Sequence, residues 1–144
     1  MIAHLHRLRK ERLNGDRGFT LTELLVVIVI IGILVAIAIP VFLSQRAAAQ
    51  ERSIESDVRN AIPVLETYYA DEGSYPALGT GGTDFAASGP ISGTGSPRIT
   101  VSPDVTLTIS VTGETYKIIG KHNALGTVRY TYESAVGNMV KSGG

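Results

Sequence analysis

An uninterrupted apolar run, Leu24–Leu43, constrains this chain more than any other feature. None of its 20 residues carries a charged or polar side chain. At about 1.5 Å per residue, a helix of this length covers about 30 Å, the thickness of the hydrocarbon core of a bilayer. A helix in a water-soluble core normally keeps a polar stripe, and this run has none. The sequence therefore predicts a membrane-spanning helix.

The segment that follows, Ser44–Asp71, keeps a helical periodicity but becomes amphipathic. Its apolar residues recur every three or four positions, as expected of one helical face; they are Ile54, Val58, Ile62, Leu65 and Tyr69. The other faces carry Arg52, Glu55, Asp57, Arg59 and Glu66. No stop signal separates the two segments. We expect one helix from about Thr20 to Asp71, ended by Gly73 and Pro76.

A region with strand patterns follows the helix. Gly79–Pro97 is rich in Gly, Ser and Thr and is expected to form a surface loop. From Val105 to Thr112, apolar residues alternate with Thr and Ser, which predicts a strand with one buried and one wet face. A turn at Thr112-Gly113-Glu114 precedes the next strand. The other expected strands are Tyr116–Lys121, Val128–Glu133 and, as a short addition, Ile99–Val101.

Such a sheet has one apolar face that must be covered, and the amphipathic half of the helix is the only element available to cover it. The expected fold class is therefore α+β. A long N-terminal helix, transmembrane in its first half and amphipathic in its second, packs on an antiparallel sheet of three or four strands within residues 98–140.

Charge changes sign where the apolar run begins. Residues 1–18 carry five basic and two acidic side chains, whereas the rest of the chain carries 8 basic and 11 acidic ones, so the formal net charge is zero. A basic segment beside a span stays in the cytoplasm by the positive-inside rule, which places the sheet on the far side of the membrane. The chain has no cysteine, which excludes disulfides and thiolate metal sites.

The boundary between leader and span, Arg17-Gly-Phe-Thr-Leu-Thr-Glu-Leu-Leu-Val-Val-Ile28, resembles the type III signal sequence of type IV pilins and pseudopilins. Tyr68–Pro76 also looks like the end of a pilin helix. The resemblance implies cleavage after Gly18 by a prepilin peptidase, N-methylation of the new first residue, Phe19, and a role in assembly for Glu23. Many pilins close a C-terminal loop with a disulfide, and this chain cannot.

The implied domains are a cytoplasmic leader at 1–18, a transmembrane and filament-core helix at 19–45, and an extracytoplasmic pilin head at 46–144. The head comprises the helix to about residue 72, the loop 79–97 and the sheet. The implied partners are other copies of the chain in a helical filament, the prepilin peptidase, the assembly platform with minor pilins, and membrane lipid before assembly. The protein would lie in the cytoplasmic membrane as a single-pass protein, N-terminus inside, and later in a cell-surface pilus. No cofactor, metal or catalytic residue is implied.

Glu23 has two explanations. Thr20-x-x-Glu23 is a capping-box pattern, and an acid in the first turn suits the helix dipole. Alternatively, because a carboxylate at bilayer depth is costly, Glu23 pairs with the amine created at Phe19 of a neighbouring subunit. The two roles are compatible.

Gly32 and Pro40 are candidate helix breaks. Proline removes a backbone donor and loosens the helix around it, and Pro63 does the same further along. Loosening at these positions would let the helix adapt between membrane and filament. Both residue types are also tolerated in ordinary spanning helices, so both explanations remain open.

Three other readings of the N-terminal region stay open. A pseudopilin of a type II secretion or competence system has the same features. An ordinary secretory signal peptide would be cleaved near Ala49 and leave Gln50 as the first residue, although its apolar segment is normally shorter. A plain single-span protein would keep its leader.

The residues do not favour an enzyme. His122 lies near a turn and is expected to be solvated, without catalytic partners in reach. Gly79-Thr-Gly-Gly82 lacks the Lys-Ser/Thr of a phosphate loop. The acids Asp71, Glu72 and Asp84 lack the spacing of a calcium loop and are expected to be solvated.

One basic strip could support adhesion or DNA binding. Its members are Lys117, Lys121, Arg129 and Lys141, and they are expected near Tyr130 and Tyr132. Charges on a strand face usually only solvate it. Nucleic acid therefore stays open as a partner without support from the sequence.

Overall fold

A single long helix and a small antiparallel sheet make up the fold of the computed structural model, which describes residues 18–143. The helix, α2, runs over Leu21–Glu72 and has 52 residues. The chain divides into two compact units, Met1–Phe42 and Leu43–Gly144, and each is described by itself. We call the second unit the head. The leader predicted at 1–18 lies outside the described residues except for Gly18.

Helix α2 begins and ends close to the predicted positions. At its end, Gly73 adopts a positive φ of 72°, and its N–H donates to the carbonyl of Tyr69 at 2.8 Å. This is the glycine cap that commonly terminates helices. The helix continues without interruption through Gly32, Pro40 and Pro63. Local loosening at the predicted helix breaks therefore stays a prediction.

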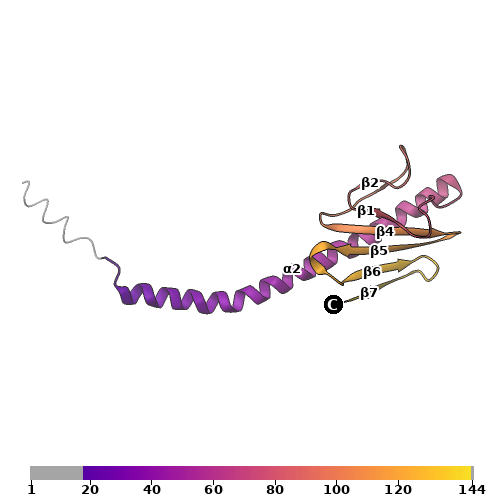
Figure 1. Ribbon diagram of the computed structural model, residues 1–144. Helices are drawn as coiled ribbons and strands as arrows, with labels where there is room; N and C mark the ends of the chain where they lie inside the picture. The colour runs from indigo at the N-terminus through magenta and orange to yellow at the C-terminus, as the bar shows by residue number, and fades with distance from the viewer. Residues whose placement is uncertain (1–17, 144) are drawn as a thin grey trace, which may run out of the picture. The chain divides into compact units, whose positions relative to one another are not determined.

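The main sheet has five antiparallel strands in the order β1-β4-β5-β6-β7 (Figure 1). Its strands are β1 Thr83–Phe85, β4 Val105–Thr112, β5 Thr115–His122, β6 Arg129–Glu133 and β7 Asn138–Ser142. Two short strands, β2 Gly89–Pro90 and β3 Arg98–Ile99, form a separate two-stranded sheet. A three-residue 3-10 helix, η1, spans Asn123–Leu125.

The α+β class is confirmed, but the expected strand count is wrong. β1 and β2 lie in the segment expected to be a loop, and β7 was not predicted. β1 has only three residues and exists because it pairs with β4, with Asp84 opposite Thr108. The short strand expected at Ile99 does form, but it pairs with β2 rather than with the main sheet. Such short edge strands depend on partners distant in the sequence.

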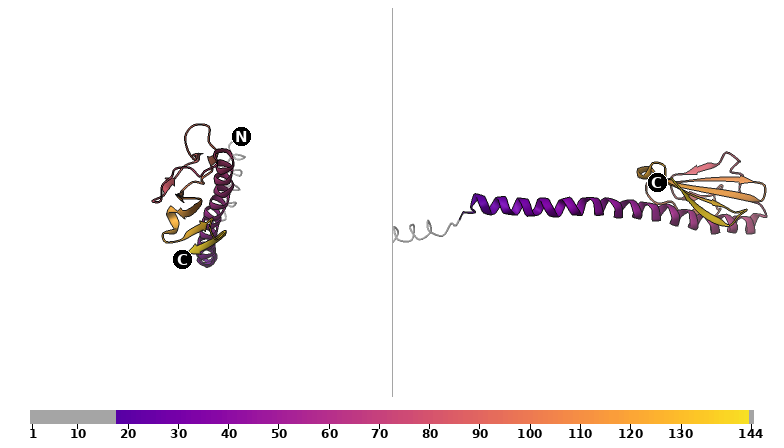
Figure 2. Two further views of the ribbon diagram at one scale, coloured as in Figure 1. Left: turned by 90° about the vertical axis from the view of Figure 1, so that its right-hand side faces the viewer. Right: turned by 90° about the horizontal axis from the view of Figure 1, so that it is seen from below.

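The head buries one face of the sheet against α2. In two views the strands lie along one side of this part of the helix (Figures 1 and 2). The fully buried helix residues are Ile54, Val58, Ala61 and Leu65, and the sheet contributes Val105, Leu107, Ile109 and Ile118. The prediction of the apolar helix face is thus confirmed for its central residues, Ile54, Val58 and Leu65. Ile62 and Tyr69, at its margins, are only partly buried.

Gly120 on β5 marks the closest approach of sheet and helix. A Cβ atom at this position would lie 2.6 Å from Cγ2 of Ile54 and 2.7 Å from Cγ2 of Val58. Real Cβ contacts are essentially never that short. The absence of a side chain at Gly120 therefore lets β5 lie directly on α2.

Asp57 contradicts the expectation that it lies on a polar face. It is only 2% exposed. Its carboxylate accepts hydrogen bonds from the N–H of Ser102 at 2.6 Å and from the hydroxyl of Ser102 at 2.9 Å. A buried carboxylate is tolerated only when such donors replace water. The side chain thus ties α2 to the loop that precedes β4.

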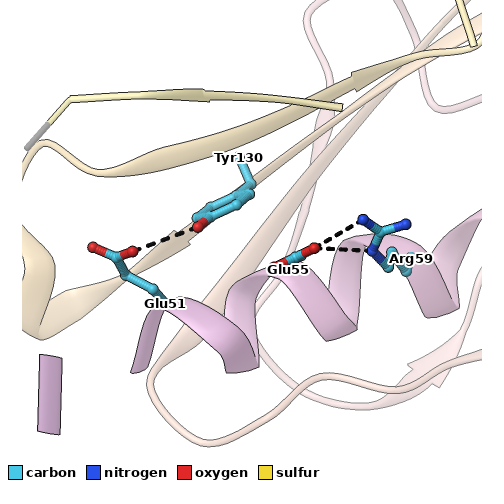
Figure 3. A network of polar contacts seen from close by, with 4 residues as sticks. All are labelled: Glu51, Glu55, Arg59 and Tyr130. Atoms are coloured by element: carbon cyan, nitrogen blue, oxygen red, sulfur yellow. Dashed lines mark hydrogen bonds and ion pairs between the residues drawn. The ribbon is translucent and has the colours of Figure 1, made fainter. Parts of the chain in front are cut away.

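A second polar contact joins the beginning of the head helix to the last strands. Glu51 accepts from the Tyr130 hydroxyl at 3.5 Å and pairs with Nζ of Lys141 at 2.7 Å. One turn further along, Glu55 pairs with Arg59 at 2.8 Å (Figure 3). These groups are partly exposed, so each pair stabilises the head by about 1 kcal/mol at most.

Candidate functional site: the start of the helix

The first turn of α2 is closed by a complete capping box. The hydroxyl of Thr20 accepts from the N–H of Glu23 at 3.2 Å. The Glu23 carboxylate in return accepts from the Thr20 N–H and the Thr20 hydroxyl, both at 2.9 Å. This reciprocal arrangement satisfies backbone donors that a helix start otherwise leaves open. The capping role of Glu23 is thereby established in the structure.

The capping box leaves part of the Glu23 carboxylate available. Both hydrogen bonds that the carboxylate accepts go to its Oε2 atom. Glu23 is exposed, and a hollow of about 410 Å³ is lined by Gly18, Phe19, Thr20 and Glu23. The geometry thus allows Oε1 to accept from a group outside the subunit.

The predicted cleavage bond lies just outside the helix. Gly18, Phe19 and Thr20 precede the first helical residue, Leu21, and all three are exposed. Phe19 is 84% exposed. A peptidase needs an extended and accessible backbone, and Gly18, Phe19 and Thr20 lie in neither a helix nor a strand. Cleavage and methylation remain predictions.

The apolar run of α2 is exposed along its whole length in the part of the chain that the structure describes. Every residue from Leu24 to Leu43 is exposed, and the exposed fraction of its large apolar side chains ranges from 44% at Val35 to 64% at Ile37 and Phe42. By length and composition, α2 is the one helix among the described residues that could cross a membrane. A helix that is apolar on all sides must be buried in lipid or among other helices.

His122 contradicts the expectation that it is solvated. It is 8% exposed, because it continues the inward-facing series Tyr116, Ile118 and Gly120 on β5. Its Nδ1 accepts from the N–H of Ala124 at 3.1 Å and caps η1. This contact assigns His122 a structural role. The alternation of inward-facing residues along Tyr116, Ile118 and Gly120, continued by one more step, predicts from the sequence that His122 faces the core.

The other candidate residues lie apart from one another. Asp84 accepts from the Thr108 hydroxyl at 2.6 Å, while Asp71 and Glu72 lie at the end of α2. Between residues 18 and 143, no group of three or more His, Asp or Glu side chains could hold a metal ion. Arg129 faces away from Tyr130 and Tyr132, because neighbouring residues of a strand point to opposite faces. Of the four cations considered for a basic strip, Lys141 lies opposite Tyr130, whereas Lys117, Lys121 and Arg129 lie on the other face of the sheet.

Comparison with known proteins agrees with the signal at the helix start. Residues 13–39 match the family described as the prokaryotic N-terminal methylation motif. Over 70 residues the chain is 36% identical to the type II secretion system core protein G of Klebsiella michiganensis, and the match covers 49% of each chain.

Two pilus proteins are similar to the chain in the same way. The type IV wide pilus major component PilA4 of Thermus thermophilus is 42% identical over 63 residues, which are 44% of this chain and 48% of PilA4. The type IV major pilin protein PilA of Myxococcus xanthus is 35% identical over 69 residues, which are 47% of this chain and 31% of PilA.

The chain thus spans about half or less of the length of these relatives. No solved structure matches it. The motif at the helix start is nevertheless specific, because residues 13–39 combine the glycine, the first-turn acid and most of the apolar run. This chain carries the prokaryotic N-terminal methylation motif, and its homologues are type IV pilins and type II secretion core proteins G.

Proposed function

We propose that the chain is a structural subunit of a type IV pilus. It is inserted in the cytoplasmic membrane with its N-terminus inside, cleaved after Gly18, methylated on Phe19 and polymerised through α2. The observation that carries this proposal is the continuity of the methylation motif with a helix whose apolar first half is exposed on all sides. We propose no enzymatic activity and no cofactor.

The same apolar surface serves the subunit twice in this mechanism. Before assembly, lipid covers Leu24–Leu43. After assembly, the corresponding surfaces of neighbouring helices cover it, so the apolar area is never left in water. The described head then coats the filament, because its sheet, loops and polar helix faces can remain solvated.

Glu23 sets the register of the filament in this proposal. Cleavage converts the amide nitrogen of Phe19 into a positively charged amine. The Glu23 carboxylate keeps its capping box through Oε2 and accepts from the amine of a neighbouring subunit through Oε1. Such a buried pair specifies an arrangement more dependably than it adds net stability.

Coexpression with a prepilin peptidase tests the processing step. Intact-mass measurement of the purified chain is expected to show the loss of residues 1–18 and the gain of one methyl group on Phe19. Gly18→Val is the matched control and is expected to keep the leader. A chain that begins at Gln50 would support an ordinary signal peptide, and an unchanged mass would support a plain single-span protein.

Two substitutions separate the roles of Glu23. Glu23→Gln keeps a side-chain acceptor for the capping box but removes the charge, so we expect processed subunits that assemble far more slowly. Thr20→Ala weakens the box but keeps the charge, so assembly should persist. Filament yield measured by shearing and sedimentation decides between them. Wild-type yield from Glu23→Gln would contradict the pairing.

A second candidate function rests on the matches to core protein G. In that case the chain is a pseudopilin of a secretion system, with the same processing and the same helical packing. Long, abundant surface filaments seen by electron microscopy in the native cell would favour the pilus. Loss of protein secretion on deletion of the gene, without loss of filaments, would favour the pseudopilin.

A further inference from the structure

The face of the main sheet that points away from α2, here called the outer face, is defined by the strand register. On β4 and β5 the buried residues alternate with exposed or partly exposed ones, and the latter form the outer face. The pairing extends this face to β6 and β7, because Ile119 lies opposite Thr131 and Thr131 opposite Val140. The face is rich in hydroxyl groups; they belong to Thr106, Thr108, Ser110, Thr112, Thr115, Thr131 and Ser142.

Four cations lie on the last three strands, and the structure separates them into two kinds. Lys117 pairs with Glu133 at 2.7 Å on the outer face. Lys141 lies in register with Tyr130 on the inner side and pairs with Glu51 at 2.7 Å. Lys121 and Arg129 are in none of the ion pairs formed within residues 18–143. Their charges are therefore not compensated by an ion pair with any residue that the structure describes.

Lys121 and Arg129 are also direct cross-strand neighbours on the outer face. Nη1 of Arg129 donates only to the carbonyls of Gly126 and Thr127, at 3.4 and 3.3 Å, and these are long contacts. Like charges directly opposite each other in a sheet are destabilising. An anion placed between the two side chains would convert this repulsion into attraction.

The surroundings of this cation pair indicate the chemical class of the anion. Thr106 lies in register with Lys121, and Ser142 with Arg129. The next row contains Ile119 and Val140, the latter 53% exposed. Hydroxyl groups can donate and accept, so they suit a ligand that carries hydroxyls of its own.

Nucleic acid is a poorer match to the outer face. Single-stranded nucleic acid is normally held by aromatic rings on which the bases stack. The four strands β4–β7 place no aromatic residue on this face, and Tyr116, Tyr130 and Tyr132 point toward α2 by the same alternation. We propose that the outer face of the head binds an acidic polysaccharide, whose carboxylate or sulfate groups are held by Lys121 and Arg129.

Two cations per subunit, the exposed Arg129 and the partly exposed Lys121, give only weak binding, because water and salt screen them. Repetition of the site along a filament would raise the effective affinity without any new contact. This gain in avidity rests on the proposed function, whereas binding by the single subunit does not.

The test uses the full processed chain in two forms, detergent-solubilised subunits and purified filaments. The immobilised probes are alginate, dextran as the neutral polysaccharide, and duplex DNA. Lys121→Gln/Arg129→Gln is compared with Lys117→Gln/Lys141→Gln, which removes the same amount of charge from the paired lysines. We expect the first double variant to bind alginate about five- to thirtyfold more weakly than the wild type, and the control to stay within about twofold.

Several results would overturn the inference. They are equal losses in the two double variants, equal binding to dextran and alginate, or binding to DNA without binding to alginate. The two proposals remain separable. Failure to form filaments, with alginate binding of subunits that depends on Lys121 and Arg129, contradicts only the proposed function. Filaments that form but do not bind alginate contradict only this inference.

Discussion

At the scale of single residues, the head is fixed on its helix by a few side-chain hydrogen bonds, made by the buried Asp57 and the exposed Glu66. The Asp57 carboxylate accepts hydrogen bonds from the N–H and the hydroxyl of Ser102. The Glu66 carboxylate accepts from the hydroxyls of Tyr116 at 2.7 Å and Tyr75 at 3.3 Å. Each of these contacts joins α2 to a segment that follows it in the sequence. Such contacts contribute modestly when made and cost considerably when one partner is removed.

Asp57→Ala tests the first of these contacts. The substitution leaves the Ser102 N–H without its acceptor, so we expect the free energy of unfolding to fall by about 2–4 kcal/mol. Ser102→Ala removes only the hydroxyl and should cost about 1 kcal/mol. Asp71→Ala, at an exposed position, is the control and should stay within about 0.5 kcal/mol. Urea denaturation of the chain in detergent measures the free energy of unfolding of all three variants. Equal changes for Asp57→Ala and Asp71→Ala would show that the contact between Asp57 and Ser102 does not stabilise the head.

Tyr116 predicts a dependence of stability on pH. Burial, followed by the hydrogen bond to Glu66, raises the pKa of the Tyr116 phenol well above its ordinary value. The unfolded phenol loses its proton near pH 10, whereas the folded one keeps it. The contribution to stability is therefore complete below about pH 10 and is lost as the pH rises further.

Denaturation curves between about pH 8 and 11 check this expectation. Tyr116→Phe should reduce the decline in the free energy of unfolding at alkaline pH. It should not abolish the decline, because burial and Glu66 also raise the pKa of Tyr75. An unchanged slope in the variant would show that Tyr116 titrates normally in the folded head.

At the scale of elements, α2 meets two environments along one uninterrupted helix. Its first part is apolar on all sides, whereas its second part buries only one stripe, formed by Ile54, Val58, Ala61 and Leu65. The change in pattern coincides with the boundary between the two compact units, after Phe42. The packing of the second part depends on β5 lying close, and Gly120 is the residue that permits this.

Gly120→Ala should therefore weaken the contact between helix and sheet. The added methyl group would overlap Cγ2 of both Ile54 and Val58, and overpacking of this kind costs about 1–3 kcal/mol. Gly81→Ala is the matched control, because a Cβ at that position meets nothing within 4 Å. The midpoint of urea denaturation reports the difference. Equal midpoints would mean that α2 and β5 are not in close contact.

At the scale of the whole molecule, the proposed function fixes the topology of the chain across the membrane. The absence of cysteine allows single cysteines to be introduced without background. Thr112→Cys, at an exposed position of β4, should react with a membrane-impermeant maleimide in intact cells. Leu5→Cys combined with Gly18→Val should react only after the membrane is permeabilised. The reverse pattern would contradict the proposed orientation.

Sequence patterns located the elements whose residues are contiguous. The apolar run and the stripe from Ile54 to Leu65 defined α2, and strict alternation defined β4 and β5. Thr20-x-x-Glu23 indicated the capping box. These features depend on local periodicity or on groups three residues apart, so neighbouring residues are sufficient to specify them.

Other features required partners that are distant along the chain. β1 and β7 are strands because β4 and β6 offer them an edge, and their own residues give only a weak strand pattern. The burial of Asp57 depends on Ser102, 45 residues away. The distinction between compensated and uncompensated cations depends on which acid each strand brings into reach.

The sequence by itself determined the helix, its apolar first half, the motif at its start and the class of the fold, because these follow from composition and short-range spacing. The tertiary structure decided the number of strands, the burial of Asp57 and His122, the fit of Gly120 and the isolation of Lys121 with Arg129. Each of these is set by cross-strand register or by the packing of α2 on the sheet. The physical reason is that these features depend on which residues far apart in the sequence come into contact. The local sequence pattern is compatible with several such contacts, and only the folded chain shows which of them form.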